Sequence, residues 1–118
     1  TLKQRNPKLI VVAVEPKSCA ILSTGKAGTH KIQGLSSGHI PDILRLDLID
    51  DIITVSNEDA ISFAQDIACL EGLPVGISSG AALKAAMVVG HREEFKGKNI
   101  VVILADNAER YFSTELFK

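Results

Sequence analysis

The sequence predicts an α/β fold, in which part of an open, mostly parallel β-sheet is covered by helices. Three continuous apolar runs, at residues 9–14, 52–55 and 100–104, predict the strands. Such runs are typical of strands that are buried on both faces, because a half-exposed strand alternates apolar and polar residues. Two helical patterns lie between the second run and the third. This order favours parallel pairing with right-handed crossovers.

The first strand is followed by Glu15-Pro16, and residues 17–22 are predicted to form a short helix. Residues 25–41 contain four glycines and few apolar side chains, which predicts a long irregular loop. Loops of this length in compact domains are usually functional. His30 and His39 in this loop could act as acid–base groups, but exposed loop histidines are the favoured interpretation.

The first of the two long helices follows the second strand. Ser56 with Asp59 three residues later is a capping-box signature. Apolar residues then repeat at helical spacing over residues 60–70, and Gly72 is predicted to end the helix.

The second long helix is predicted over residues 79–89 and ends at Gly90. Ser78 or Ser79 can act as its N-cap, because a serine hydroxyl accepts a hydrogen bond from an unpaired N–H of the first turn. Apart from Lys84 the helix carries only small or apolar side chains, so we expect it to be packed nearly all round.

The composition indicates one domain or part of one, because the chain has 118 residues, 46% of them hydrophobic. The net charge of −1, the few aromatic residues and the lack of a long apolar run exclude a nucleic-acid groove and a membrane span. Cys19 and Cys69 lack Cys-x-x-Cys spacing, so we expect no metal site and a reducing, cytoplasmic location. Three strands need more cover than this chain supplies, which predicts marginal stability and partners from N-terminal sequence or another subunit.

Two segments contain candidate binding residues. Residues 75–80, Val-Gly-Ile-Ser-Ser-Gly, place serine hydroxyls at the positive end of a helix, where an electron-rich ligand atom can be held. For this segment alone, an ordinary capped core helix is the favoured interpretation. Asp106 follows the third predicted strand, and ligands of open α/β sheets bind beyond the carboxyl ends of strands. Its position alone therefore predicts that Asp106 faces a pocket.

The residues that follow Asp106 are interpreted as structural. Glu109 and Arg110 are expected to form an ion pair that orders the turn, and Tyr111 is expected to bury its ring. His91 lies just after the second helix and is expected to complement the helix dipole.

Several segments together resemble one enzyme family. These segments are residues 30–34 (His-Lys-Ile-Gln-Gly), 38–41 (Gly-His-Ile-Pro), 76–80 (Gly-Ile-Ser-Ser-Gly) and 109–114 (Glu-Arg-Tyr-Phe-Ser-Thr). In this order and spacing they resemble cysteine synthase (O-acetylserine sulfhydrylase), a fold-type-II enzyme that depends on pyridoxal phosphate. The resemblance implies that residues 1–118 are the C-terminal segment, about the last third, of an enzyme of this kind, within its large cofactor-binding domain.

The resemblance implies roles for individual residues. Ser78 matches the serine whose hydroxyl meets the pyridine nitrogen of the cofactor. Gly34 matches a glycine of the loop that closes near the bound amino acid, and Ser36 belongs to the same substrate loop. Ser79 would cap the helix, and Ser79 and Asp106 are expected to line the pocket. No lysine of the chain matches the Schiff-base lysine, so the catalytic lysine is expected upstream.

The chain departs from the family pattern at three positions. Ser36 and His39 stand in a loop that usually reads Gly-x-Gly-x-Gly-Phe, and Ala105 stands where the last strand usually exits through proline. The donor and acceptor substrates therefore remain open. The family's asparagine loop for the substrate carboxylate and its Gly-Thr-Gly-Gly-Thr phosphate cup also have no match in this sequence.

The resemblance implies β-replacement, in which O-acetyl-L-serine and sulfide give L-cysteine and acetate. It also implies a homodimer and docking of the C-terminal tail of a serine acetyltransferase. We expect the isolated chain to be inactive. The alternative is a stand-alone, non-catalytic binding or regulatory module derived from the same fold.

Overall fold

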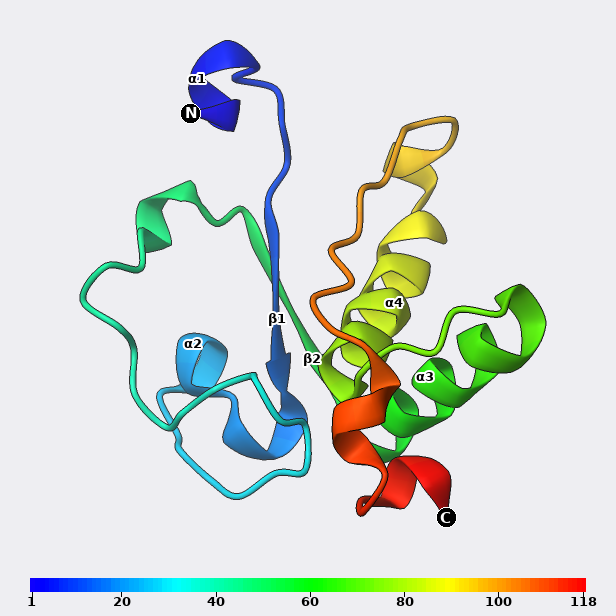
Figure 1. Ribbon diagram of the computed structural model, residues 1–118. Coiled ribbons are helices and arrows are strands. Elements are labelled where there is room, and N and C mark those ends of the chain that lie inside the picture. The colour runs from blue at the N-terminus through cyan, green and yellow to red at the C-terminus, as the bar shows by residue number, and fades with distance from the viewer.

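The computed structural model describes residues 1–118 and confirms the α/β class. The α-helices and strands, in chain order, are α1 Leu2–Arg5, β1 Val12–Pro16, α2 Ile21–Thr24, β2 Asp51–Val55, α3 Asn57–Glu71 and α4 Ile77–Gly90. Short 3-10 turns lie at Lys17–Cys19, Leu46–Leu48, Glu93–Phe95, Ala108–Tyr111 and Glu115–Phe117. In Figure 1, α2 and the long loop lie on one side of the strands, and α3 and α4 lie on the other.

The sheet consists of β1 and β2, which pair in parallel from Val12 opposite Asp51 to Pro16 opposite Val55. The parallel pairing is confirmed. The first strand begins later than its apolar run, because the main chain at Val11 bonds to Asp50. The Asp50 carboxylate accepts the Val11 N–H at 2.7 Å, and the Val11 carbonyl accepts the Asp50 N–H at 2.9 Å.

The third predicted strand is absent, so this prediction is wrong for the chain. Residues 100–104 lie outside every helix and strand and make no main-chain hydrogen bond. Val101 is 85% exposed and Ile103 is 75% exposed. An apolar run forms a strand only where a neighbouring strand accepts and donates its ladder bonds, and none lies beside it here.

Helix α3 begins and ends at the predicted residues. Ser56 is its N-cap, with the Ser56 hydroxyl accepting the Asp59 N–H at 3.1 Å, and Gly72 is its left-handed C-cap. The Asp59 carboxylate does not complete a capping box, because it lies 3.4 Å from the Lys84 Nζ on α4.

Helix α4 packs closely against α3. A Cβ on Gly80 would lie well inside 3.0 Å of the Ala60 carbonyl oxygen, so only glycine permits this approach. Near its C-terminal end α4 lacks cover, since Met87 is 51% exposed and Val88 is 39% exposed. The prediction that α4 is packed nearly all round is therefore wrong for this chain. No helix is both long and apolar enough to cross a membrane.

Candidate functional site

The candidate site is centred on the first turn of α4. This helix begins at Ile77, with Gly76 as its N-cap in an extended conformation and with no side-chain cap. The Gly76 carbonyl accepts the N–H of Ser79 at 3.1 Å and of Gly80 at 3.2 Å. The prediction that Ser78 or Ser79 caps the helix is therefore wrong, because the chain enters the helix two residues earlier and both serines lie inside the first turn.

The Ser78 side chain is half-buried, and its hydroxyl makes no hydrogen bond within the chain. The loop brings Gly34 beside it: a Cβ built on Gly34 would lie 3.8 Å from the Ser78 Oγ. Gly34 has a φ of +91°, which favours glycine. The two residues that the resemblance singles out for cofactor and substrate thus lie together, and an unpaired hydroxyl at the positive end of a helix is free to bind an acceptor.

Ser79 has a different environment from Ser78. It is only 1% exposed, and its hydroxyl accepts the N–H of Ala105 at 3.1 Å. A proline at position 105 would have no N–H to donate. The departure from the family pattern at Ala105 therefore provides a hydrogen bond that fastens the end of the 100–104 segment to α4.

Asp106 packs beneath the turn at Gly76. Its carbonyl accepts the Gly76 N–H at 3.0 Å, and a Cβ on Gly76 would lie inside 3.0 Å of its Oδ1. The Tyr111 hydroxyl donates a short hydrogen bond to the Asp106 Oδ2, whereas Oδ1 is buried without a partner. This hydrogen bond, followed by burial and the carboxylate charge, raises the pKa of Tyr111 from 10.0 to about 12. The Tyr111 ring is buried as predicted.

The predicted ion pair between Glu109 and Arg110 does not form. Neighbours in sequence point away from each other on the 3-10 turn Ala108–Tyr111, and this separates the two side chains. The His91 prediction agrees with the structure, since His91 is the C-cap of α4 and its Nδ1 lies 2.6 Å from the Met87 carbonyl.

The irregular loop at residues 25–41 is held by Ser36 and His30. Ser36 has a φ of +41°, in the left-handed region that favours glycine, and its hydroxyl donates to the Cys19 carbonyl at 3.1 Å. His30 Nδ1 accepts the Ile32 N–H at 3.2 Å, and His30 Nε2 lies 2.9 Å from the Ser36 carbonyl. These bonds are satisfied together by a neutral imidazole with its proton on Nε2. The sequence favoured an exposed loop histidine at this position. In the structure, His30 is instead a structural residue that holds the loop.

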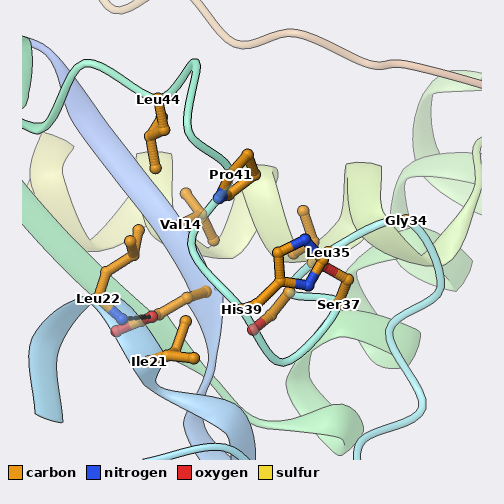
Figure 2. Close-up of a pocket in the computed structure, with 11 residues that line it drawn as sticks. Val14, Ile21, Leu22, Gly34, Leu35, Ser37, His39, Pro41 and Leu44 are labelled. Atoms are coloured by element: carbon orange, nitrogen blue, oxygen red, sulfur yellow. Dashed lines mark hydrogen bonds between the residues drawn. The ribbon is translucent and has the colours of Figure 1, made fainter. Parts of the chain in front are cut away.

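A cavity of about 470 Å³ lies under this loop and extends to Gly34. Its lining residues come from β1, α2 and the loop (Figure 2): Val14, Glu15, Ile21, Leu22, Gly34, Leu35, Ser36, Ser37, His39, Pro41 and Leu44. His39 is exposed at the cavity, and its Nδ1 lies 3.1 Å from the Ser37 hydroxyl. The sequence indicated no role for Glu15, which is only 2% exposed. Its carboxylate accepts the N–H groups of Leu22 and Ser23 and the Ser23 hydroxyl at 2.5–3.0 Å.

The sequence matches the family described as pyridoxal-phosphate dependent enzyme over residues 1–106. It is 50% identical over 116 residues to cysteine synthase B of Campylobacter jejuni, covering 98% of this chain and 38% of that protein. It is 51% identical over 122 residues to the cysteine synthase of Buchnera aphidicola subsp. Schizaphis graminum, again covering 98% of this chain and 38% of that protein. The chain therefore spans about 38% of the length of these curated relatives.

Solved structures give the same relationship. A cysteine synthase from Entamoeba histolytica superposes with a TM-score of 0.96 at 38% identity, covering 98% of this chain and 34% of that one. An O-ureido-L-serine synthase superposes with a TM-score of 0.92 at 37% identity, covering 98% of this chain and 36% of that one. The fold of this chain is thus a part of the fold of these proteins.

Proposed function

Because the chain belongs to the family of pyridoxal-phosphate dependent enzymes, we propose that it provides part of a cysteine synthase. The reaction replaces the acetate of O-acetyl-L-serine with sulfide and gives L-cysteine and acetate. The observation that carries this proposal is the unpaired Ser78 hydroxyl at the start of α4 with Gly34 against it. Relatives named as cysteine synthases at about 50% identity support the choice of reaction.

The residues at this turn fit the pyridine end of the cofactor. Ser78 has a free hydroxyl that can donate to a ring nitrogen, and the absence of a side chain at Gly34 leaves room for a flat ring to approach. The cofactor, when bound, withdraws electrons from the amino-acid substrate. A neutral hydroxyl at the positive helix end disfavours protonation of the ring nitrogen, which moderates this withdrawal.

The loop that contains Gly34 and Ser36 is proposed to form one wall of the substrate pocket. Ser36 anchors the loop to the Cys19 carbonyl, and His39 stands exposed where the cavity opens. We propose that His39 and Ser36 influence which substrates are accepted, because they replace a phenylalanine and a glycine of the resembling family.

We propose that residues 1–118 alone do not catalyse the reaction. Four lysines are held in ion pairs: Lys3 with Asp50, Lys31 with Glu115, Lys84 with Asp59 and Lys96 with Glu93. No lysine lines the cavity at Gly34. The Schiff-base lysine and the phosphate site are proposed to come from the part of a cysteine synthase that this chain does not match. The resemblance also supports a homodimer and the docking of a serine acetyltransferase tail as proposals.

A second candidate function is a non-catalytic module that binds a small ligand or a partner. The substitutions at Ser36, His39 and Ala105 favour it, since each changes the wall or the anchoring of the site.

The two functions are separated by titrating the chain with pyridoxal phosphate, followed by borohydride reduction and peptide mapping. We expect no adduct on a single lysine for the chain alone. We then expect cysteine formation after co-expression with the unmatched part of Campylobacter jejuni cysteine synthase B. Ser78→Ala should lower cofactor affinity in that complex, and Ser113→Ala, at an exposed serine outside the cavity, is the matched control. A defined lysine adduct on the chain alone would overturn the proposed inactivity, and a complex that forms no cysteine would favour the module.

A further inference from the structure

The loop at residues 25–41 has, at Ser36, a backbone conformation that is rare for a residue with a side chain. Ser36 has a φ of +41° and is the single non-glycine residue of the chain in the left-handed region. This conformation is costly for such a residue and persists only where the surroundings fix it. The resembling family has a glycine here, which adopts the conformation without strain. A serine at this position therefore points to contacts that hold it.

Three contacts converge on Ser36. Its hydroxyl donates to the Cys19 carbonyl at 3.1 Å and lies 3.2 Å from the Cys19 Sγ. Its carbonyl lies 2.9 Å from the Nε2 of His30, six residues earlier in the loop. Cys19 is 0% exposed, so the hydroxyl is tied to a buried part of the molecule. Both the side chain and the main chain of Ser36 are thus held.

The segment at residues 32–36 is also fastened to the core. Ile32 is 0% exposed and belongs to the core cluster, and Leu35 packs against the same cluster. The Leu35 N–H donates to the Ile32 carbonyl at 3.3 Å. Gly34 lies within this segment, against the Ser78 hydroxyl. The position of Gly34 therefore depends on neighbours that are held on both sides.

The early part of the loop packs on the same turn that Ser36 contacts. A Cβ on Gly28 would lie well inside 3.0 Å of the Ser18 carbonyl oxygen, so only glycine permits this approach. Ser18 and Cys19 both belong to the 3-10 turn Lys17–Cys19, which follows β1. The loop thus contacts this turn at two places, eight residues apart, and this restrains it from moving as a unit.

We propose that Ser36 is a positioning residue that holds the loop in one preformed arrangement, with Gly34 against Ser78. In the resembling family this loop closes near the bound amino acid. Here the serine replaces that movement with a fixed wall, so the amino-acid substrate meets a site that is already arranged. The link to the substrate rests on the proposed function, whereas the rigidity of the loop does not.

The rigidity is tested on the 118-residue chain by amide exchange measured with mass spectrometry. We expect residues 32–36 to exchange slowly in the parent. Ser36→Gly relieves the strained φ but loses both contacts to Cys19, so exchange there should become about five- to tenfold faster. Ser113→Ala, at an exposed serine outside the loop, is the matched control and should change nothing. Rapid exchange of residues 32–36 in the parent, or equal exchange in Ser36→Gly, would overturn the proposal.

A crosslink distinguishes a fixed loop from a moving one. Because the Ser36 Oγ lies 3.2 Å from the Cys19 Sγ, Ser36→Cys should form a disulfide with Cys19 when the thiols are oxidised with diamide. Activity is measured after co-expression with the unmatched part of Campylobacter jejuni cysteine synthase B. The crosslinked form should keep its kcat within about twofold of the parent, and the parent treated with diamide is the control, since Cys69 is exposed. Ser36→Gly should raise the KM for O-acetyl-L-serine about fivefold with little change in kcat.

Each result of the crosslinking experiment bears on the fixed loop. A crosslinked form that loses turnover would overturn the proposal, because the loop would then have to move. Failure of the disulfide to form would also overturn it, because the two side chains would not meet. Slow exchange in the chain, together with a complex that forms no cysteine, would support the fixed loop and remove the link to the substrate along with the proposed function.

Discussion

Replacing Asp106 with asparagine should lower the pKa of Tyr111. The Tyr111 hydroxyl donates to the Asp106 carboxylate at the start of α4, and this bond is the largest cause of the rise in pKa from 10.0 to about 12. The difference corresponds to about 3 kcal/mol in favour of the protonated phenol in the folded chain. Asparagine retains an acceptor oxygen but removes the charge, and burial still acts, so we expect the pKa of Tyr111 to fall below about 12 while staying above 10.0.

The phenolate absorbance measures this pKa directly, because Tyr111 is the single tyrosine and the chain has no tryptophan. Glu109→Gln is the control, since Glu109 is a nearby acid that does not contribute to the Tyr111 pKa. Circular dichroism recorded in parallel separates ionisation from unfolding. A Tyr111 pKa that stays at about 12 in the Asp106→Asn variant would refute the assigned cause.

The same pair predicts how stability depends on pH. The folded pKa of Tyr111 lies above its unfolded value of 10.0. The stabilisation is therefore fully present below pH 10 and is lost as the pH rises toward about 12. Alkaline unfolding should begin at lower pH in the Asp106→Asn variant.

Three further predictions concern the packing around α4 and β2. Gly80→Ala should destabilise the chain by about 1–3 kcal/mol in urea unfolding, because the new Cβ would overlap the α3 main chain; an unchanged midpoint would contradict the close helix contact. Ala105→Pro should destabilise the chain by about 1–3 kcal/mol, because it leaves the Ser79 hydroxyl without its donor. Ala105→Gly keeps the N–H and should lower the free energy of unfolding by less. Arg92 holds the pKa of Asp51 below 3.8 by a hydrogen bond, so this pair stabilises above that pH and the contribution is lost as the pH falls further. Arg92→Gln should reduce that acid dependence, because the Ile52 N–H still lowers the pKa of Asp51. Identical acid unfolding of the variant and the parent would contradict the role of Arg92.

Helix α3 shows how far local sequence signals extend. Ser56 and Gly72 mark its ends because capping uses atoms within a few residues of each other, and both are visible in the sequence. The apolar runs likewise indicated the parallel pair of β1 and β2. The motif around Ser78 indicated which helix end carries the candidate site.

Predictions that depended on contacts between distant segments were less successful. The run at 100–104 has the composition of a strand but no neighbour to pair with. Ser79 was expected to cap its own helix and instead accepts a hydrogen bond from Ala105. His30 was expected to be a free histidine and instead holds the loop at Ser36.

The sequence by itself determined the α/β class, the ends of α3, the irregular loop and the resemblance that singled out Ser78 and Gly34, because each depends on local pattern or motif. Only the tertiary structure decided that Gly34 lies against Ser78, that Asp106 accepts the hydrogen bond of Tyr111, and that the third apolar run lines an open groove. The reason is physical: hydrogen bonds and burial depend on which segments the fold places next to one another, and no spacing along the chain specifies those neighbours.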